Sequence, residues 1–587
     1  MSLCGYWKLR VDGARSHWLI TVTRSCTEWA DKGLERCRRP TDRGPFFSIA
    51  KWACIAWYSA ARLACILFAN IISSLWHLVI YVVLVPCKLF FRNKQKQDRI
   101  KHVFIVALEN RPFDHMLGLS NIQGTDAMSG QPTTIDGLNE SNNWNLDPNG
   151  KKVFATAPAD WAMMHDPGHE FPDVKEQLCG AGGDYPHINN SGFVTNYSHI
   201  NHDNPAEIMK CYSPEQLPVL TALAREFAVC DHWYSSMPGP TWPNRFFVHA
   251  ASSGGLDHSP SNLDMASSIL FNGYKFDNGT IYDSLDEEDI KWTIYHGDEL
   301  PQALVISGMH LKLLEGHFKD FEDFAGDVSH PGYSTSYIFI EPSYGHVLTQ
   351  GGTFKCGNSQ HPLDDITRGE RLLKNIYEII RNSPHWESSV LIITYDEHGG
   401  FYDHVAPPEA IAPGDSITDP ENNRYNFDFK RLGVRVPAVI VSPLIPKGSI
   451  DHTVYDHTSL LATAEDIFGL TPLTERDKHA NTFKHLFSLE TPRMDAPTTL
   501  PEPANSGIRC DDEEVNAVTP TVAAYAADAT APVDPSLQGF MHVAFLRDLH
   551  VSPPEEKERL AAKYRNINTR LEAKQYLKEV RSKIKRS

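Results

Sequence analysis

The amino-acid sequence predicts an α/β protein with a central, mostly parallel β-sheet, preceded by a single transmembrane helix. Three observations support this prediction. From residue 102 onward, short runs of β-branched and apolar residues alternate with stretches that have the 3.6-residue period of amphipathic helices. Two of the apolar runs end in side chains that carry oxygen ligands. Near the N-terminus, residues 63–85 form a long apolar stretch.

The length of 587 residues exceeds what one hydrophobic core normally holds, so we expect one large domain with appendages. The net charge of −18 is uneven, because residues 1–101 are basic and the rest of the chain is strongly acidic. An acidic body argues against a nucleic-acid partner. The expected segments are a basic N-terminal segment at 1–62, a transmembrane helix at 63–85, the main domain at 100–490, a linker or C-terminal extension at 491–550 and a basic amphipathic helix at 551–587.

The apolar stretch at 63–85 would be about 34 Å long as a helix, and a bilayer core is about 30 Å thick. The alternatives are a buried helix of a larger N-terminal unit and a misassigned gene start. Basic residues between Lys88 and Lys101 follow the stretch and place the main domain on the cytosolic side. We therefore expect a single-pass membrane protein, whose five cysteines after residue 101 could stay reduced. Four glycosylation sequons favour the opposite side, and they begin at Asn139, Asn189, Asn196 and Asn278.

The first strand that ends in oxygen ligands is Val390–Tyr395, a run of β-branched and apolar residues typical of a buried strand. Asp396 and Glu397 follow it directly, and two glycines then allow a sharp turn of the backbone. Adjacent carboxylates repel each other unless a cation or a proton offsets their charge. Because ligands bind beyond the carboxyl ends of strands in open α/β sheets, the pattern predicts a metal site. The alternative is a solvated loop after a core strand.

A second strand has the same form. His102–Leu108 is apolar apart from its first residue and ends in Glu109 and Asn110, which again carry oxygen ligands. Two strands with such ends favour one shared divalent cation more strongly than either strand alone. The residues do not identify the cation.

The segments after these strands resemble the signatures of a known family. Glu109–Gly118 resembles the ENRSFDHMLG signature of the phosphoesterase family, which includes non-specific phospholipases C and related acid phosphatases; Pro112 replaces the usual serine. Tyr395–His404 is similar to the second signature, and the resemblance extends from about residue 102 to about residue 483. It implies an alkaline-phosphatase-like α/β sandwich and a catalytic domain at 100–490. The metal ligands that it implies are Glu109, Asn110, Asp396 and Glu397.

The segment Asp231–Arg245 supplies a hydroxyl group. Prolines and a glycine restrict the backbone around Thr241, and an apolar, helix-like run follows at Phe246–Ala251. A hydroxyl at a helix N-terminus, beside a cation, has its alkoxide form stabilised by both. From the residues alone, Thr241 could simply cap the helix. The resemblance implies that Thr241 is the nucleophile and a further metal ligand.

Histidines are the side chains expected to protonate a leaving group. Met164–His169 and Ser359–Pro362 resemble elements of the family that carry active-site histidines. The resemblance implies that His165 and His361 are catalytic. The residues expected to support the metal site or to contact substrate are His169, Arg245, Asp403 and His404.

Together with these residues, the resemblance implies a hydrolase of phosphoric esters with a metal-activated threonine. The preferred reaction is that of a phospholipase C, which releases diacylglycerol and a phospho-headgroup from a membrane phospholipid. The alternatives are a broad-specificity acid phosphatase and a non-catalytic, membrane-tethered scaffold. No G-x-S-x-G, G-x-x-x-x-G-K-[ST] or H-E-x-x-H motif is present, which disfavours serine lipases, P-loop enzymes and zinc proteases. The C-terminal helix would either rest on anionic lipid or pack on its own domain.

Overall fold

The computed structural model describes residues 99–509, with gaps at 261–272, 299–300, 346–353 and 417–421, and parts of residues 541–583. Residues 99–587 belong to one compact unit. Its centre is a ten-stranded sheet in the order β3-β2-β13-β6-β12-β11-β1-β10-β8-β9. In this order the strands are Pro132–Thr134, Gln123–Asp126, Ser449–Asp451, Ala228–Cys230, Ala438–Val441, Ser389–Tyr395, His102–Leu108, Tyr337–Glu341, Trp292–His296 and Phe318–Asp320. Two small sheets pair β4 (Trp144–Leu146) with β5 (Lys152–Phe154), and β7 (Trp233–Tyr234) with β14 (Tyr455–Asp456).

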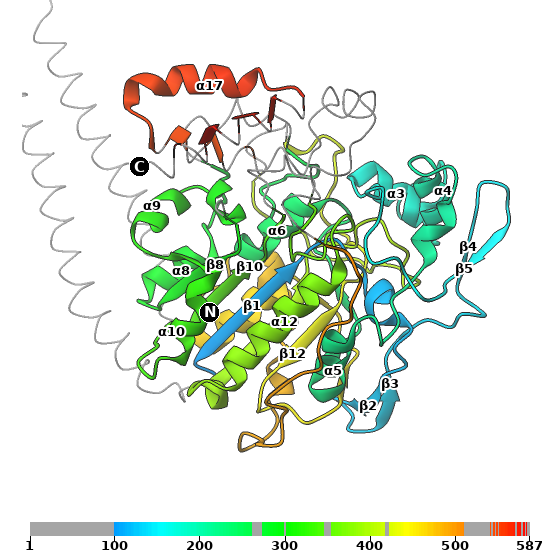
Figure 1. Cartoon of the computed structure of the whole chain (residues 1–587), viewed down its shortest axis with the longest axis horizontal. Coiled ribbons are helices and arrows are strands. Elements are labelled where there is room, and N and C mark those ends of the chain that lie inside the picture. The colour runs from blue at the N-terminus through cyan, green and yellow to red at the C-terminus, as the bar shows by residue number, and fades with distance from the viewer. Residues whose placement is uncertain are drawn as a thin grey trace, which may run out of the picture. The chain divides into compact units, whose positions relative to one another are not determined.

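Helices surround this sheet, and Figure 1 shows α12 running across it beside β1. The α-helices are α3 (Phe171–Cys179), α4 (Phe193–Ser198), α5 (Pro218–Glu226), α6 (Thr241–Ala250), α8 (Ile281–Glu287), α9 (Met309–Leu314), α10 (Phe324–Ser329), α12 (Ile366–Arg381), α13 (Thr458–Phe468), α14 (Glu475–His479) and α17 (Lys557–Arg565). Shorter 3-10 or π turns are η1 (Asp114–Gly118), η2 (Pro205–Met209), η3 (Gln302–Val305), η4 (Phe321–Asp323), η5 (Trp386–Ser388), η7 (Lys484–Leu486) and η8 (Pro554–Glu556).

The sheet is mixed but mostly parallel, which confirms the predicted α/β class. β1 pairs in parallel with β10 and β11, and all seven residues of β1 and of β11 are buried. Burial on both faces explains why these strands are continuous apolar runs rather than alternating ones. β12 is antiparallel to both of its neighbours, and β2 is antiparallel to β3.

The helix α12 has apolar residues at helical spacing on one face. The Asp365 side chain caps its first turn by accepting a hydrogen bond from the Thr367 backbone N–H at 3.0 Å. Burial of each aliphatic side chain on its inner face contributes about 1.5–3 kcal/mol. The buried side chains of this stripe include Leu372, Leu373, Ile376, Tyr377 and Ile380.

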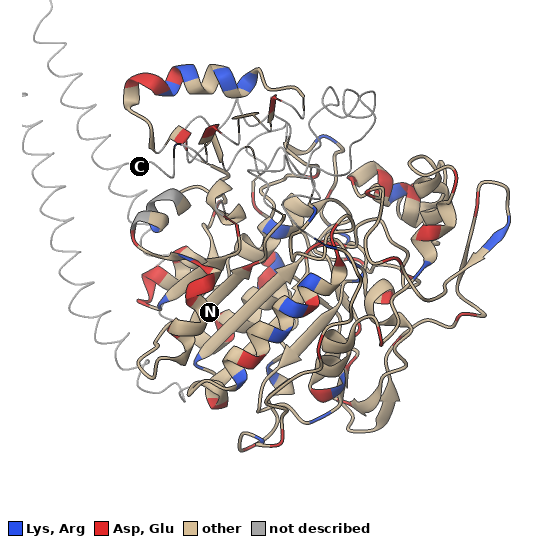
Figure 2. Cartoon of the chain, viewed as in Figure 1, with Lys and Arg blue, Asp and Glu red and all other residues tan. Residues whose placement is uncertain are grey.

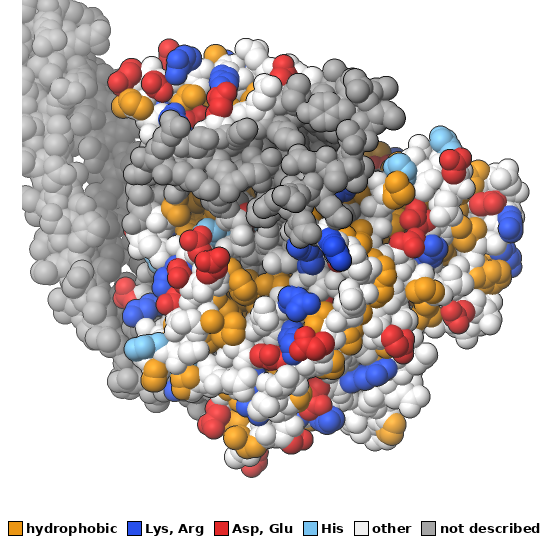
Figure 3. All heavy atoms as spheres, viewed as in Figure 1, with side chains coloured by type: hydrophobic (Ala, Val, Ile, Leu, Met, Phe, Trp, Pro, Cys, Tyr) orange, Lys and Arg blue, Asp and Glu red, His pale blue; other side chains and the backbone are white. Residues whose placement is uncertain are grey.

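The C-terminal segment packs on the body of the protein through its apolar stripe. Leu560, Tyr564 and Ile567 are buried and belong to the same hydrophobic core as the central sheet. Tyr564 stacks on Phe545 with ring centroids 4.4 Å apart. Of the two alternatives for this helix, the structure supports packing on its own domain. Figure 2 shows both basic and acidic residues along α17, and charges of both signs are interspersed on the face seen in Figure 3.

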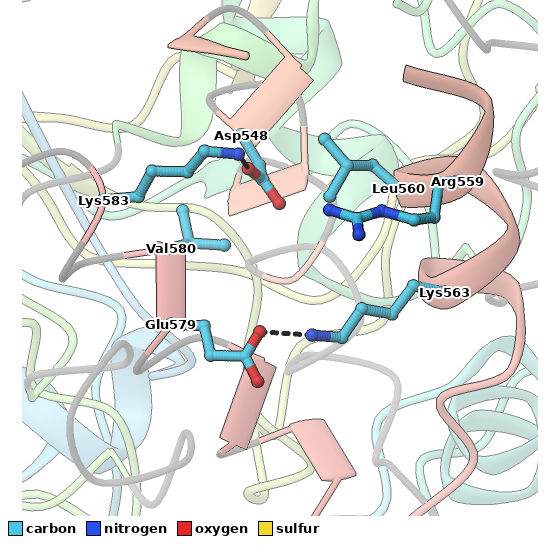
Figure 4. A pocket seen from close by; sticks show the side chains of 7 residues that line it. All are labelled: Asp548, Arg559, Leu560, Lys563, Glu579, Val580 and Lys583. Carbon is cyan, nitrogen blue, oxygen red and sulfur yellow. Dashed lines mark hydrogen bonds and ion pairs between the residues drawn. The ribbon is translucent and has the colours of Figure 1, made fainter. Parts of the chain in front are cut away.

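A cavity of about 300 Å³ lies beneath α17 (Figure 4). Four of its five charged groups form two ion pairs: Lys583 Nζ lies 2.8 Å from Asp548 Oδ1, and Lys563 pairs with Glu579. The fifth, Arg559, pairs with Glu556 outside the lining. The apolar part of its lining includes Leu560. None of the predicted site residues lines this cavity.

The prediction of a single-pass membrane localisation, with a cytosolic catalytic domain, is wrong on the evidence of the described helices. None of them is long and apolar enough to cross a membrane. The longest, α12, has 16 residues and is amphipathic, whereas a span needs about 20 apolar residues. The stretch 63–85 itself lies outside the described residues.

The thiols also differ from expectation. Cys179, Cys211 and Cys230 are buried and free. Cys356 is disulfide-bonded, so the expectation that the cysteines of the body stay reduced is wrong at this position.

Candidate active site

The parallel register of β1 and β11 brings the two predicted strand ends together. Leu108 lies opposite Tyr395, so Glu109 and Asp396 follow at the same edge of the sheet. Asp396 donates its backbone N–H to the Leu108 carbonyl at 3.1 Å, and the Asn110 N–H donates to Asp396 Oδ1 at 3.0 Å. All these side chains are buried. The edge is therefore a fixed cluster of oxygen atoms rather than a solvated loop.

The turn after β11 depends on its glycines. Gly399 has a φ of +63°, and a Cβ there would lie 2.2 Å from the Asn110 carbonyl oxygen. Its N–H donates to Glu397 Oε2 at 2.7 Å. Glycine at this position lets the turn approach Asn110 closely and holds Glu397 in the cluster.

Thr241 begins α6 and reaches the same cluster. Its Oγ1 donates a hydrogen bond to Asn110 Oδ1 at 3.2 Å, and the side chain is buried. The loop before it is held by Asn244, whose Nδ2 donates to the carbonyls of Met237, Gly239 and Pro240 at 3.1–3.2 Å. The structure thus places the candidate nucleophile beside the carboxylates, at the N-terminus of a helix.

Arg245 lies about one helical turn after Thr241 and partly neutralises the cluster. Its Nε lies 3.1 Å from Asp396 Oδ2, and its Nη2 lies 3.7 Å from Glu109 Oε1. Burial lowers the pKa of Arg245, but the Tyr344, Asp396 and Glu109 side chains outweigh it and raise that pKa. The guanidinium remains charged and fixes the orientation of both carboxylates.

Three carboxylates against one guanidinium leave the cluster short of positive charge. Burial raises the pKa of Asp396 to about 6, although Arg245 opposes the shift and Glu397 adds to it. Burial likewise raises the pKa of Glu109 well above its usual value. Glu109 Oε2 and Glu397 Oε1 are buried and accept no hydrogen bond from any described residue. A divalent cation with oxygen ligands would satisfy these atoms, so the residues fit a metal.

Two of the predicted histidines lie near this cluster. His169 is buried; burial lowers its pKa, but Glu397, Asp166 and Glu170 raise it to about 10. His361 is also buried, and burial and the charge of His169 lower its pKa well below the usual value. The His361 Nε2 lies 3.6 Å from Asp166 Oδ2, and its ring stacks on Phe354.

His165, by contrast, has an exposed side chain. The structure brings His169 and His361 together near Glu397 and leaves His165 at the surface. The His-Asp-Pro-Gly-His element carries two histidines, and its sequence alone does not tell which one is buried.

Asp403 and His404 belong to an adjoining ion cluster. Arg435, fully buried, donates from Nε to Asp403 Oδ1 and from Nη2 to Asp114 Oδ1, both at 2.9 Å. His404 Nδ1 lies 2.7 Å from Asp114 Oδ2. This cluster joins the segment after β1 to the segment after β11. Asp403 and His404 therefore support the positions of the two signature segments and do not contact the Glu109 carboxylate.

Several residues near the site were not predicted. His457 is buried and donates from Nε2 to the Asp396 carbonyl oxygen at 2.6 Å. Gln302 donates from Nε2 to Glu109 Oε1 at 3.4 Å. Neither residue stands in a quoted signature or directly after a predicted strand, so only the fold reveals them.

Comparisons with known proteins identify the family of this chain. The profile of the Phosphoesterase family matches residues 100–471. The chain is 36% identical over 445 residues to non-specific phospholipase C1 of Arabidopsis thaliana, covering 72% of this chain and 78% of the relative. It is 37% identical over 442 residues to non-specific phospholipase C6 of the same plant, covering 73% and 80%. Phospholipase C B of Mycobacterium tuberculosis is 27% identical over 397 residues, covering 63% and 74%.

Solved structures give weaker matches. A protein in the alkaline phosphatase superfamily from Vibrio parahaemolyticus superposes with a TM-score of 0.27 at 14% identity, covering 46% of this chain and 66% of that one. The phosphonate monoester hydrolase of Agrobacterium radiobacter superposes with a TM-score of 0.27 at 12% identity, covering 47% and 73%.

Proposed function

Because this chain belongs to the phosphoesterase family and is an enzyme that hydrolyses phosphoric esters, we propose that it acts as a phospholipase C on phospholipid. Its products are diacylglycerol and a phosphorylated headgroup. Both plant relatives are named as phospholipases C. The observation that carries the proposal is Thr241 beside Asn110, at the edge where Glu109, Asp396 and Glu397 converge.

In this proposal one divalent cation is held by Glu109, Asn110, Asp396 and Glu397, with Thr241 as a further ligand. When bound, it lowers the pKa of the threonine hydroxyl and stabilises charge on the phosphoryl oxygens. The unpaired oxygens of Glu109 and Glu397 support this ligand set.

The chain's own residues divide the reaction into two displacements. The Thr241 hydroxyl gives up its proton, Oγ1 attacks phosphorus and the bond to the diacylglycerol oxygen breaks, which leaves a phospho-threonine that still carries the headgroup. Water then attacks phosphorus, releases the phospho-headgroup and restores the hydroxyl. A helix N-terminus stabilises anionic oxygens, so the start of α6 would add to the stabilisation of the phosphoryl group.

The leaving oxygen needs a proton, and we assign that task to the pair of His169 and His361. Their surroundings shift the two pKa values in opposite directions, so one ring is protonated while the other is neutral. Such a pair can give and take protons within one site. The exposed His165 receives no role here.

The test uses the full-length chain on phosphatidylcholine micelles and, in parallel, on a soluble phosphomonoester. We expect release of diacylglycerol and phosphocholine. Thr241→Ala and Asp396→Asn should each lose at least about 10²-fold in kcat, while Thr241→Ser keeps a measurable rate. Cleavage of the monoester alone would identify a phosphatase instead. Full activity of Asp396→Asn, with an unchanged melting temperature, would refute the proposed site.

A further inference from the structure

A second group of metal-ligating side chains lies at the same edge of the sheet. β6 and β13 are parallel neighbours, with Cys230 opposite Asp451. Asp231 follows the first strand and His452 follows the second, and His232 comes directly after Asp231. This layout repeats the one at β1 and β11, where parallel strand ends bring ligands together.

The three side chains converge on one point. His232 Nδ1 lies 2.8 Å from Asp231 Oδ1, and His452 Nδ1 lies 2.9 Å from Asp231 Oδ2. One ligand atom from each residue lies within 4.8 Å of the others. At a tetrahedral zinc site with bonds of about 2.1 Å, the ligand atoms lie about 3.4 Å apart. The two hydrogen-bonded separations are 2.8 Å and 2.9 Å, so a bound ion would replace the N–H protons and widen them by about 0.5 Å.

The outward nitrogens of both rings also have partners. His232 Nε2 lies 3.4 Å from Asp136 Oδ2, and His452 Nε2 lies 3.0 Å from Thr133 Oγ1. Metal-bound histidines usually donate their other N–H to a carboxylate or a similar acceptor, which fixes the ring. Each ring here presents one nitrogen to the shared carboxylate and the other to such an acceptor.

His232 lies between the Asp136 and Asp231 carboxylates, so an added positive charge on its ring is favourable. A neutral imidazole has a single N–H, so it cannot donate to Asp136 and to Asp231 at once. A second proton on the ring or a metal ion on Nδ1 would supply this positive charge, and a metal ion would displace the proton.

In the adjoining ion cluster, an arginine already neutralises the carboxylates. Asp114, Asp403 and His404 also lie close enough to hold an ion, but the buried Arg435 already pairs with both carboxylates. Among the described residues, no lysine or arginine forms an ion pair with the Asp231 carboxylate. Arg435 donates instead to the Asp231 backbone oxygen at 2.8 Å. The Asp231 carboxylate also accepts the Asp136 backbone N–H at Oδ2, at 2.7 Å. Positive charge can therefore reach it from its two histidines or from a bound ion.

An ion can also reach this group. The Asp231 carboxylate is fully buried, whereas the side chains of His232 and His452 are 23% and 33% exposed. Water can therefore complete the coordination on the outer side. Two imidazole nitrogens and one carboxylate oxygen select a divalent transition metal over Mg²⁺ or Ca²⁺.

We propose that Asp231, His232 and His452 form a second divalent transition-metal site of the Zn²⁺ class, separate from the candidate active site. β12 lies between β6 and β11, so the two sites are about 10 Å or more apart at the usual strand spacing. The ion joins the carboxyl end of β6 to that of β13 and stabilises this part of the sheet. Its role is structural, and the esterase reaction does not pass through it.

The test counts bound Zn²⁺ in the full-length protein. The chain is stripped with a chelator, dialysed against Zn²⁺ and analysed for metal per chain. We expect His452→Ala to bind one equivalent less than the wild type. The matched control is His485→Ala, a half-buried histidine that lies 2.9 Å from Asp451 Oδ2 outside the cluster. It should bind as much Zn²⁺ as the wild type.

A second comparison separates this site from the catalytic one. The double variant Asp396→Asn/His452→Ala should bind one equivalent of Zn²⁺ less than Asp396→Asn alone. Asp231→Asn should lower the affinity for that equivalent at least about 10-fold. Co²⁺ absorption bands from this site should disappear in His452→Asn, which preserves more of the side chain. Equal Zn²⁺ content in the wild type, His452→Ala and Asp231→Asn would overturn the proposal and leave a protonated His232 as the whole explanation.

Discussion

Arg435 is the residue that holds the two signature segments at a fixed distance. It pairs with Asp114 after β1 and with Asp403 after β11, and all three side chains are fully buried. Removing one partner of a buried ion pair costs about 3–5 kcal/mol, because the other charge remains without compensation. Arg435 and its partners lie beside the candidate site. They hold the two signature segments in place, so the positions of the site residues depend on them.

The charge of His404 makes this cluster sensitive to pH. Burial lowers the pKa of His404, but hydrogen bonds to Asp114 and Asp136 raise it to about 10. A histidine whose pKa is higher in the folded state than in the unfolded state stabilises the fold below the unfolded pKa of about 6.5. That stabilisation is lost as the pH rises through about 10.

We therefore expect His404→Gln to lower the melting temperature at pH 6.5 and to bring it closer to the wild-type value at pH 10. The difference in stability at the lower pH should be about 2 kcal/mol, since the ring is partly exposed. Thermal unfolding across this range measures it. His199→Gln, an exposed histidine paired with Glu176, should show no such convergence. A constant difference between wild type and His404→Gln would rule out the proposed charge.

At the scale of single residues, the sequence predicts the candidate metal ligands but not the charged side chains that form ion pairs beside them. Glu109, Asn110, Asp396 and Glu397 each follow a buried strand, and this local signal is visible along the chain. Arg435 contacts Asp114 across 321 positions of sequence, and nothing near Arg435 marks that contact. Long-range charge pairs of this kind come only from the fold.

At the scale of elements, the turn after β11 and the turn after β1 act as one unit. Gly399 combines a positive φ with close approach to Asn110, so an alanine there meets both backbone strain and a steric clash. The Asn110 backbone also takes a left-handed φ of 58°. A shift of either turn would move the hydrogen-bond partner of Thr241.

We expect Gly399→Ala to lower the stability by about 1–3 kcal/mol and the kcat by more than the folded fraction explains. Gly448→Ala is the matched control, because its φ is +67° but the nearest atom to its Cβ would be 3.8 Å away. The control should cost about 1 kcal/mol and keep the activity per folded molecule. Melting temperatures and rates on the same samples test this. Equal loss of activity in both variants would show that the turn does not position Asn110.

Elements with long apolar runs were predictable, and short ones were not. β1, β11 and α12 have 7, 7 and 16 residues, and their periodicity or continuous burial is visible in the sequence. β6 and β13 have three residues each, too few to show any period. The proposed second metal site lies after these two short strands, so no local pattern in the sequence marks it.

For the whole molecule, the segment after the catalytic body is tied to that body. α12 anchors residues 496–500: Lys374 donates to the Leu500 carbonyl at 2.7 Å, and Arg381 Nε donates to the Ala496 carbonyl at 3.1 Å. Farther along, Tyr564 and Tyr576 are buried in the main core. The start of the predicted linker therefore packs as part of the fold. Its backbone carbonyls accept hydrogen bonds from side chains of α12.

The C-terminal helix provides the last prediction. Tyr564 is fully buried and stacks on Phe545, so Tyr564→Ala should destabilise the whole protein by about 3–5 kcal/mol. Arg565→Ala, an exposed neighbour on the same helix, should change the stability by less than about 0.5 kcal/mol. Thermal unfolding and limited proteolysis of the C-terminal segment measure both effects without lipid. If the helix instead used its apolar stripe on anionic lipid, Tyr564→Ala would leave the melting temperature unchanged and would weaken binding to phosphatidylserine vesicles. That outcome would place the helix outside the core.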